Sequence, residues 1–363
     1  MKIYAILDSN QEVLNGCFYH RIHNPLMELK RRGHEIEYMT LTAIEWDKLK
    51  EADIAIFSRT YDNPHFALMW RCKAAGIKVV YELDDDIFNI PRTNIANSAY
   101  EANNGRLKKR IEDTIAEADL VTTTTEPLKK ILSQFHDNVQ IIPNALNLDK
   151  WQERAGSDDL VIGWSGGQNH IEDLGLIVDV IKDLQEKYDF RFVIQGITGK
   201  PMEADGYEAS VMKSIGSDNQ AFETVNNMKL DLYKKLLSLK NFNHIPFYPP
   251  DMHSKVVSRA DIDIGLIPII GYKFDESKSV LKLLEYTAAG TPAIASNELP
   301  YKGIAPYTVK NTRKDWYKAI EAMIKDKSLR KKILTKQKEL LFPKYDIKVV
   351  GEQWENSFNK IIK

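Results

Sequence analysis

Short apolar runs alternate with amphipathic segments along most of this chain. The runs in the first part are rich in β-branched residues and are bounded by polar turns, a pattern typical of strands buried in a parallel sheet. Between them, apolar positions recur at helical spacing and stop at a glycine, the residue favoured just past a helix C-terminus. The pattern predicts strands at residues 2–7, 35–40, 54–57, 78–83 and 120–123, and helices at 21–32 and 65–75.

A second series of the same kind follows, with predicted strands at residues 160–164, 190–195, 242–247, 262–269 and 293–296. Two such series predict an α/β protein with a doubly wound parallel sheet in each half. The length of 363 residues also exceeds what one core of ordinary size holds. Residues 139–151 look like a strand leading into a linker, and we place the boundary near Asn147.

One connection in the second half is unusually long. Residues 199–241 insert roughly 40 residues between two predicted strands, well beyond an ordinary connection of this type. The part at 231–239 looks helical, and the rest is polar and irregular. A plain surface insertion is favoured, because loops tolerate extra length cheaply, although a lid or an oligomer contact stays open.

The segment 274–296 carries the clearest chemistry. A predicted helix opens near Ser279 and ends at Gly290, with Lys278, Lys282 and Glu285 on one face. Free N–H groups around Ser279 and Val280, at the positive end of the helix dipole, would hold a diphosphate, and Glu285 would accept hydrogen bonds from ribose hydroxyls. A solvated charged face explains the spacing about equally well.

This segment resembles the C-terminal signature of the group 1 GT-B glycosyltransferases, in the variant form K-S-x-x-K-x-x-E-Y-x-A-x-G-x-P. The resemblance implies that the helix binds a sugar nucleotide and that Glu285 contacts its ribose. Most group 1 members carry a second glutamate where this chain has Lys278, so the contacts to the donor sugar are not carried over. Lys278 and Lys282 are then the candidates for neutralising the diphosphate.

The resemblance also implies an architecture of two Rossmann-like doubly wound domains that face each other across a cleft. Residues 1–147, joined by about 345–363, would form the acceptor-side domain, and residues 148–344 would form the donor domain. The terminal segment has a helical pattern with Trp354 and Phe358 on one face, and the resemblance implies that it crosses back to the first domain.

A glycine-containing loop follows the first predicted strand of the second half, in the sequence IGWSGGQNHIEDL. Gly166 and Gly167 let the backbone approach a ligand, Ser165 offers a hydroxyl, and His170 lies at a helix start where it would meet the diphosphate or the donor sugar. The spacing does not fit a dinucleotide fingerprint. Group 1 members usually carry an arginine and a lysine here, so Lys255 is a further candidate for the missing charge, with Arg259 more simply explained as a solvated residue.

Two segments of the first half end at the expected ligand edge of its sheet. In NGCFYHR, Gly16 and Arg21 are expected to face the cleft, whereas Tyr19 and His20 are weaker candidates. Asp84, Asp85 and Asp86 follow a strand and resemble the metal motif of the GT-A class. The C-terminal signature argues against that interpretation, so they are placed on the acceptor side without a metal. Capping of the next turn is an equally good explanation.

Composition limits the function only loosely. The net charge of −1 predicts no general attraction to polyanions, and Cys17 and Cys72 are too few for a disulfide framework. There is no apolar stretch of about 18 residues, the length a membrane span needs. These features favour a cytoplasmic protein with no transmembrane segment; the oligomeric state is open.

The residues and the resemblance together predict transfer from a nucleoside-diphosphate sugar, such as a UDP-sugar, with no other cofactor. The resemblance alone implies that the transfer is retaining. A surface glycan or a lipid-linked hydroxyl is the default acceptor. Basic clusters at 30–32 and 106–110 keep a second acceptor open, the hydroxymethylated bases of phage DNA, although solvated helix faces explain them more simply. A sugar-nucleotide-binding scaffold without activity is the alternative of another class.

Overall fold

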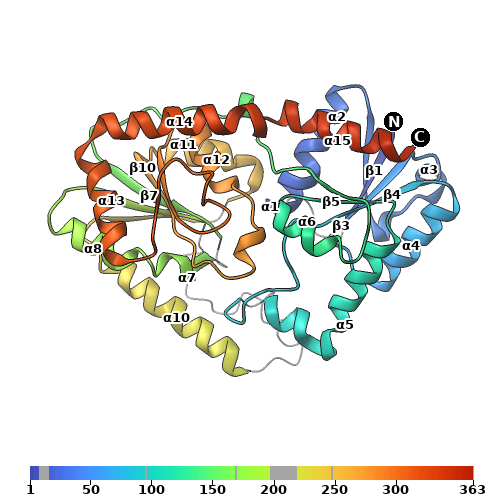
Figure 1. Ribbon diagram of the computed structural model, residues 1–363, viewed down its shortest axis with the longest axis horizontal. Coiled ribbons are helices and arrows are strands. Elements are labelled where there is room, and N and C mark those ends of the chain that lie inside the picture. Colours follow the sequence, from blue (N-terminus) through green and yellow to red (C-terminus); the bar gives the residue numbers. More distant parts are fainter. Residues whose placement is uncertain (8–15, 95, 168–169, 197–218, 247, 363) are drawn as a thin grey trace.

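The computed structural model describes residues 1–7, 16–94, 96–167, 170–196, 219–246 and 248–362. Two six-stranded sheets lie side by side, and every strand pair in both is parallel (Figure 1). The strand orders are β2-β1-β3-β4-β5-β6 and β12-β11-β10-β7-β8-β9. The predicted α/β class with two doubly wound halves is therefore confirmed.

The first sheet holds the strands predicted from the first apolar series. The apolar runs of β1, β3, β4 and β5 are buried because helices cover both faces of the sheet, whereas the edge strand β2 is partly exposed. The bounds are β1 Lys2–Leu7, β2 Glu35–Thr40, β3 Ile54–Ser58, β4 Lys78–Glu82, β5 Leu120–Thr123 and β6 Val139–Ile141, with helices α1 Gly16–Phe18, η1 Tyr19–His23 (a π-helical turn), α2 Asn24–Arg31, η2 Leu41–Ala43, α3 Trp46–Leu49, α4 Asn63–Ala74, α5 Ala96–Glu117 and α6 Glu126–Leu132.

The second sheet repeats the plan, and its central strands β7 and β10 carry the site. The bounds are β7 Val161–Ser165, β8 Arg191–Gln195, β9 Phe242–Ile245, β10 Ile264–Ile267, β11 Ala293–Ser296 and β12 Thr308–Val309, with helices η3 Leu148–Lys150, α7 Ile171–Leu174, α8 Val178–Gln185, α10 Asn219–Leu237, η5 Pro250–Met252, α11 His253–Arg259, η6 Asp275–Ser277, α12 Leu281–Ala288, α13 Arg313–Lys325, α14 Lys327–Tyr345 and α15 Ile347–Ile362.

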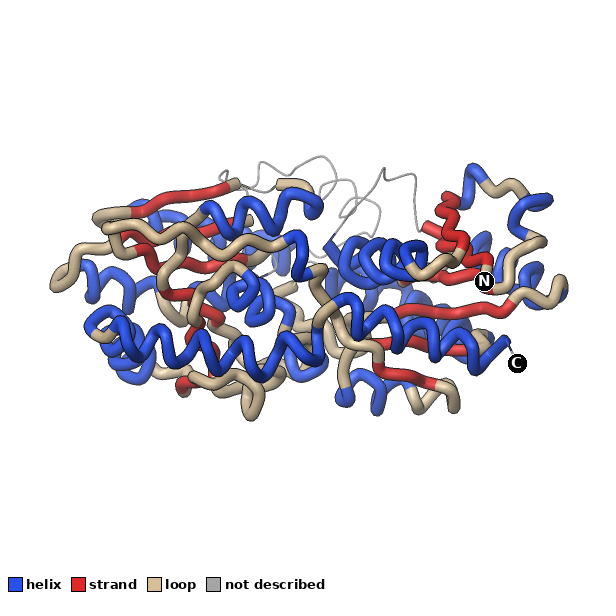
Figure 2. Tube along the Cα trace, turned by 90° about the horizontal axis from the view of Figure 1, so that it is seen from above, coloured by secondary structure: helices blue, strands red, loops and turns tan. Residues whose placement is uncertain are grey.

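The C-terminal helices connect the two halves. Helix α14 packs on α12 and α13, whereas α15 packs on α2 of the first half, and Figures 1 and 2 show the pair running from one half to the other. Trp354 and Phe358 are buried in the first half's core, as the helical pattern predicted. Leu146 bonds to Tyr345 and Ile347 through the backbone, so the two passages between the halves lie side by side. The domain limits at 147 and 345 stay predictions.

The strand orders place a topological switch in each sheet. In the second sheet the chain moves outward from β7 to β9 and then returns to β10 on the other side of β7. Ligands of such sheets bind where the strand order reverses, at the carboxyl ends of the strands. The loops after β7 and β10 are the two segments with predicted phosphate chemistry. In the first sheet the corresponding switch lies between β1 and β3.

The long insertion is only partly described. Helix α10, Asn219–Leu237, includes most of the predicted helix at 231–239, and residues 197–218 lie outside the described residues. Among the helices that the structure describes, none combines the length and the apolarity needed to cross a membrane.

Candidate functional site

Helix α12 begins slightly later than the sequence predicted. Its first residue is Leu281, so Lys278, Ser279 and Val280 belong to the loop that enters it, and Lys278 has extended backbone angles. The prediction that Lys278 shares a helix face with Lys282 is therefore wrong. No side chain of the described residues caps the first turn. The helix ends as predicted, with Gly290 at a φ of +75°, a conformation that glycine adopts without strain.

Two lysine ammonium groups lie over aromatic rings beside this helix start. Lys278 Nζ is 4.6 Å from the centre of the Phe274 ring, and Lys282 Nζ is 5.0 Å from that of Trp164, at the end of β7. Burial lowers the pKa of Lys282 to about 8, although the Asp173 carboxylate opposes the shift. An anion bound beside Lys282 would favour the charged form of that side chain.

His170 is held in one orientation beside the same lysines. Its Nδ1 lies 3.0 Å from Asp173 Oδ2, and its Nε2 lies 3.4 Å from Lys278 Nζ. Burial, together with the nearby Lys278 and Lys282 ammonium groups, holds the pKa of His170 well below its usual range. The ring is therefore neutral at pH 7, with Nδ1–H donated to Asp173 and the Nε2 lone pair facing Lys278.

Glu285, the predicted ribose ligand, is buried between two histidines. Its Oε1 lies 2.9 Å from Nε2 of His253, at the start of α11, and 3.7 Å from Nε2 of His20, in the first half. Burial would raise the pKa of Glu285, but His253 and His20 outweigh it and hold that pKa below its ordinary value. Burial lowers the pKa of His20 to about 4. Glu285 is thus a carboxylate at neutral pH, in contact with both halves.

Gly166 gives the loop after β7 its close approach to Lys282. A Cβ at this position would lie 2.7 Å from the Trp164 ring and 2.8 Å from Lys282 Nζ, whereas a Cβ at Gly167 would have no atom of the described residues within 4 Å. Ser165, the last residue of β7, is buried beside them. Gly166, which was predicted to let the backbone approach a ligand, therefore also leaves the space that the Lys282 ammonium group occupies.

We expect Gly166→Ala to lower the free energy of unfolding by about 1–3 kcal/mol, because the added methyl overpacks Trp164 and displaces the Lys282 ammonium. Gly167→Ala is the matched control and should stay within about 0.5 kcal/mol, since its methyl enters open space. Urea unfolding of both variants measures the difference. Equal losses would contradict the assigned packing.

Arg21 does not face the cleft, and the prediction that it contacts the donor is corrected. It is 1% exposed and forms a bidentate pair with Glu82, with Nε–Oε1 and Nη2–Oε2 distances of 2.7 and 2.9 Å. Its Nη1 donates to the carbonyl of Ile142 and to Asn144 Oδ1. A buried guanidinium needs this full set of acceptors. Arg21 thus organises the first half rather than binding a ligand directly.

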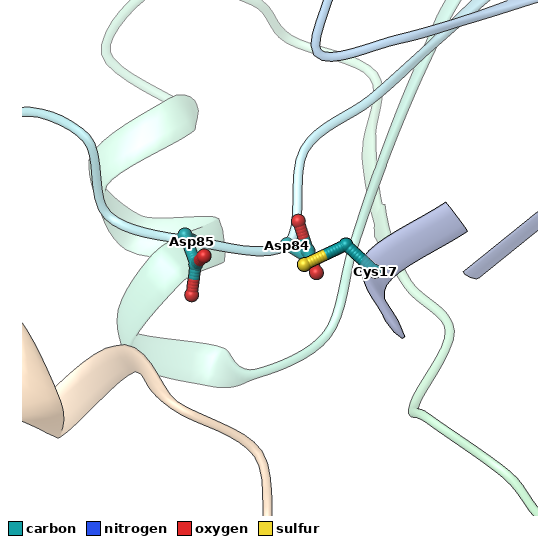
Figure 3. A group of neighbouring side chains, drawn as sticks. All are labelled: Cys17, Asp84 and Asp85. Atoms are coloured by element: carbon teal, nitrogen blue, oxygen red, sulfur yellow. The ribbon is translucent and has the colours of Figure 1, made fainter. Parts of the chain in front are cut away.

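Asp84 and Asp85 lie with Cys17 at the ligand edge of the first sheet (Figure 3). One ligand atom of each lies within 4.8 Å of the others, a spacing that a metal ion would accept. Arg59 already pairs with both carboxylates at 3.3 Å and donates to Cys17 Sγ at 3.0 Å. Its positive charge fills the role that a cation would have there, so the cluster does not by itself indicate a metal site.

The other first-half candidates have mixed positions. Asp86 is fully buried and caps the following turn, accepting from the Phe88 N–H and from Asn89. Tyr19 is 8% exposed, and its ring stacks on that of His23. Asp86 and Tyr19 were both predicted on the acceptor side; the buried Asp86 is a capping residue, and the role of Tyr19 stays a prediction. Gly16, the first residue of α1, is exposed, as is Lys255 on α11. Their predicted contacts with the donor stay predictions.

Sequence reasoning missed several residues that the fold brings to the site. His253 and Tyr248 stack beside Glu285, with ring centroids 5.6 Å apart. Asn144 donates from Nδ2 to Ser279 Oγ at 2.8 Å, and Thr125 donates to the Ser277 carbonyl at 2.8 Å. These two hydrogen bonds join the first half to the entry loop of α12. The signal for Asn144 was its place in the linker, but its partner lies 135 residues away.

No family model matches this chain, and no curated protein matches it in sequence. Several solved structures match it in fold. HepE of Anabaena in complex with UDP covers 99% of this chain and 100% of its own at a TM-score of 0.66 and 11% identity. The fold is that of a GT-B glycosyltransferase.

Two further solved structures of glycosyltransferases match at similar levels. A glycosyltransferase of Rickettsia africae has a TM-score of 0.62 at 14% identity and covers 100% of this chain and 98% of its own. An alpha-glucosyltransferase in complex with UDP and DNA containing a hydroxymethyluracil base has a TM-score of 0.65 at 14% identity, covering 99% of each chain. Identities this low establish the shared fold and nothing finer.

Proposed function

We propose that this protein is a retaining glycosyltransferase of the group 1 type that uses a nucleoside-diphosphate sugar, with UDP as the first candidate nucleotide. The observation that carries the proposal is the pair Lys278 and Lys282 at the start of α12, at the switch point of the second sheet. A diphosphate fits two cations beside a helix N-terminus. Structures with the same fold contain UDP and UDP-glucose, which supports this choice.

The donor would lie on the second half. Lys278, Lys282 and Ser279 would hold the diphosphate, and Glu285 would accept from the ribose hydroxyls. Leaving-group charge grows as the glycosidic bond breaks, and preorganised cations lower that barrier without reorganising. The lysines provide charge of the kind that a metal supplies in other transferases, so we propose metal-independent transfer. Retention of anomeric configuration follows from the resemblance in the signature segment.

The acceptor would approach from the first half, and we propose that Asp84 and Asp85, which lie beside Arg59 and Cys17, are on its acceptor side. A glycan or lipid-linked hydroxyl is the proposed acceptor. DNA is a second candidate, favoured by the neighbour that carries DNA and by exposed Arg106 and Lys109 on α5. Lys109 already pairs with Glu112 and Asp113, which reduces the charge available to phosphates.

A panel of nucleoside-diphosphate sugars tests the proposal. We expect one of them to raise the melting temperature and to be hydrolysed slowly in the absence of an acceptor. Binding without hydrolysis or transfer to any acceptor would favour the inactive scaffold instead, and no binding at all would contradict the proposal. Tight, salt-sensitive binding to duplex DNA would move the acceptor from glycan to DNA.

A further inference from the structure

A continuous chain of side-chain contacts runs from the core of the first half to the proposed diphosphate site. Glu82, at the end of β4, holds the Arg21 guanidinium in a bidentate pair. Arg21 Nη1 lies 3.3 Å from Asn144 Oδ1, and Asn144 Nδ2 lies 2.8 Å from Ser279 Oγ. This series of contacts therefore ends on Ser279, a residue that the proposed function assigns to donor binding.

The donor and acceptor groups of Arg21, Asn144 and Ser279 fix the direction of the two hydrogen bonds between them. An arginine has only donors, so the group of Asn144 that faces Arg21 must be its amide oxygen. The amide nitrogen then faces Ser279 and donates to its hydroxyl oxygen. Asn144 is 8% exposed and Arg21 is 1% exposed, which leaves the amide little freedom to turn over.

These directions determine where the Ser279 hydroxyl can donate its single proton. Because Oγ accepts from Asn144, its O–H cannot be donated to that residue and is directed to another acceptor. Ser279 is partly exposed in the loop that enters α12, close to the lysine pair. A phosphate oxygen bound there would be such an acceptor.

We propose that Asn144 is a positioning residue of the donor site: held by Arg21, it commits the Ser279 oxygen to accept and so directs the Ser279 proton toward the donor diphosphate. This inference rests on the proposed function. If Asn144 has this role, the donor site is complete only when the two halves are in contact. Thr125 supports the same loop differently, because it donates to the Ser277 backbone and leaves the Ser279 side chain alone.

A double-mutant cycle on donor affinity tests the proposal. We expect Ser279→Ala to weaken binding of the preferred sugar nucleotide about tenfold or more, since it removes a hydrogen bond to a charged group. Asn144→Ala should weaken it by a smaller factor of about 3–10. The double variant should bind no more weakly than Ser279→Ala alone, because Asn144 acts only through that hydroxyl. Calorimetric titration measures all four proteins.

Thr125→Val provides the control, because it removes the hydrogen bond that Thr125 donates to the Ser277 carbonyl in the same loop. Its effect should add to that of Ser279→Ala. Additive effects of Asn144→Ala in the wild-type and Ser279→Ala backgrounds would overturn the positioning role while leaving the proposed function standing. If the wild-type protein binds no sugar nucleotide, both are overturned. Urea midpoints, measured in parallel, report any general loss of stability.

Discussion

Replacing Lys282 with methionine is expected to lower kcat/KM for the sugar nucleotide by about 10²–10³-fold. The ammonium group lies beside the α12 start, where it would meet the charge that develops on the departing diphosphate, and losing one such preorganised donor typically costs this much. Methionine keeps most of the packing against Trp164, so the fold should survive. Steady-state kinetics with the donor measures the loss.

The pKa of Lys282 adds a pH signature to this prediction. Burial lowers that pKa to about 8, so raising the pH above 8 removes the charge from the free enzyme. Donor affinity of the wild type should therefore fall above pH 8, by up to about tenfold per pH unit. Lys336→Met is the control, because Lys336 is exposed on α14 and pairs with Glu339. Normal turnover by Lys282→Met would reject the assigned site.

Arg21→Met is expected to lower the free energy of unfolding by about 3–5 kcal/mol, since it leaves Glu82 buried without its cation. Glu82 is fully buried, and Thr122 would remain as its hydroxyl donor. Burial already raises the pKa of Glu82 in spite of Arg21, so without Arg21 the carboxyl should bind a proton more readily. The deficit relative to wild type should shrink as the pH falls. Urea unfolding at pH 7 and pH 5 measures both effects.

Two controls separate this prediction from a general effect of losing an arginine. Arg313→Met removes an exposed pair with Asp183 and should cost about 0–1 kcal/mol. The double variant Arg21→Met with Glu82→Gln should recover part of the loss, because no charge is then left buried. A cost for Arg21→Met as small as that for Arg313→Met would contradict the structural role assigned to Arg21.

Much of the fold could be predicted because burial leaves a local signature. The strands are apolar runs bounded by turns, and α15 carries its buried residues at helical spacing, with Trp354 and Phe358 four apart. The end of α12 could likewise be predicted from the local sequence, because Gly290 is the residue type favoured just past a helix C-terminus. Its start was less clear, because no capping side chain marks Val280 and the preceding loop is shaped by contacts with the first half.

The site was harder to predict because its residues find partners far along the chain. Arg21 has the same local sequence whether it binds a ligand or Glu82, which lies 61 residues away. A glutamate at the end of an otherwise apolar strand was the available signal, since a buried carboxylate needs a cation. His253 gave no such signal, because its contact with Glu285 depends on how α11 and α12 pack.

The most direct test of the central claim, a diphosphate held at the start of α12, is a calorimetric comparison of UDP, ADP and GDP with their nucleosides. We predict that at least one diphosphate binds about 100-fold more tightly than its nucleoside, because charge-assisted hydrogen bonds from the lysines and Ser279 contribute about 1.5–3 kcal/mol each. Equal affinities of every diphosphate and its nucleoside, or no binding of any diphosphate, would contradict the account.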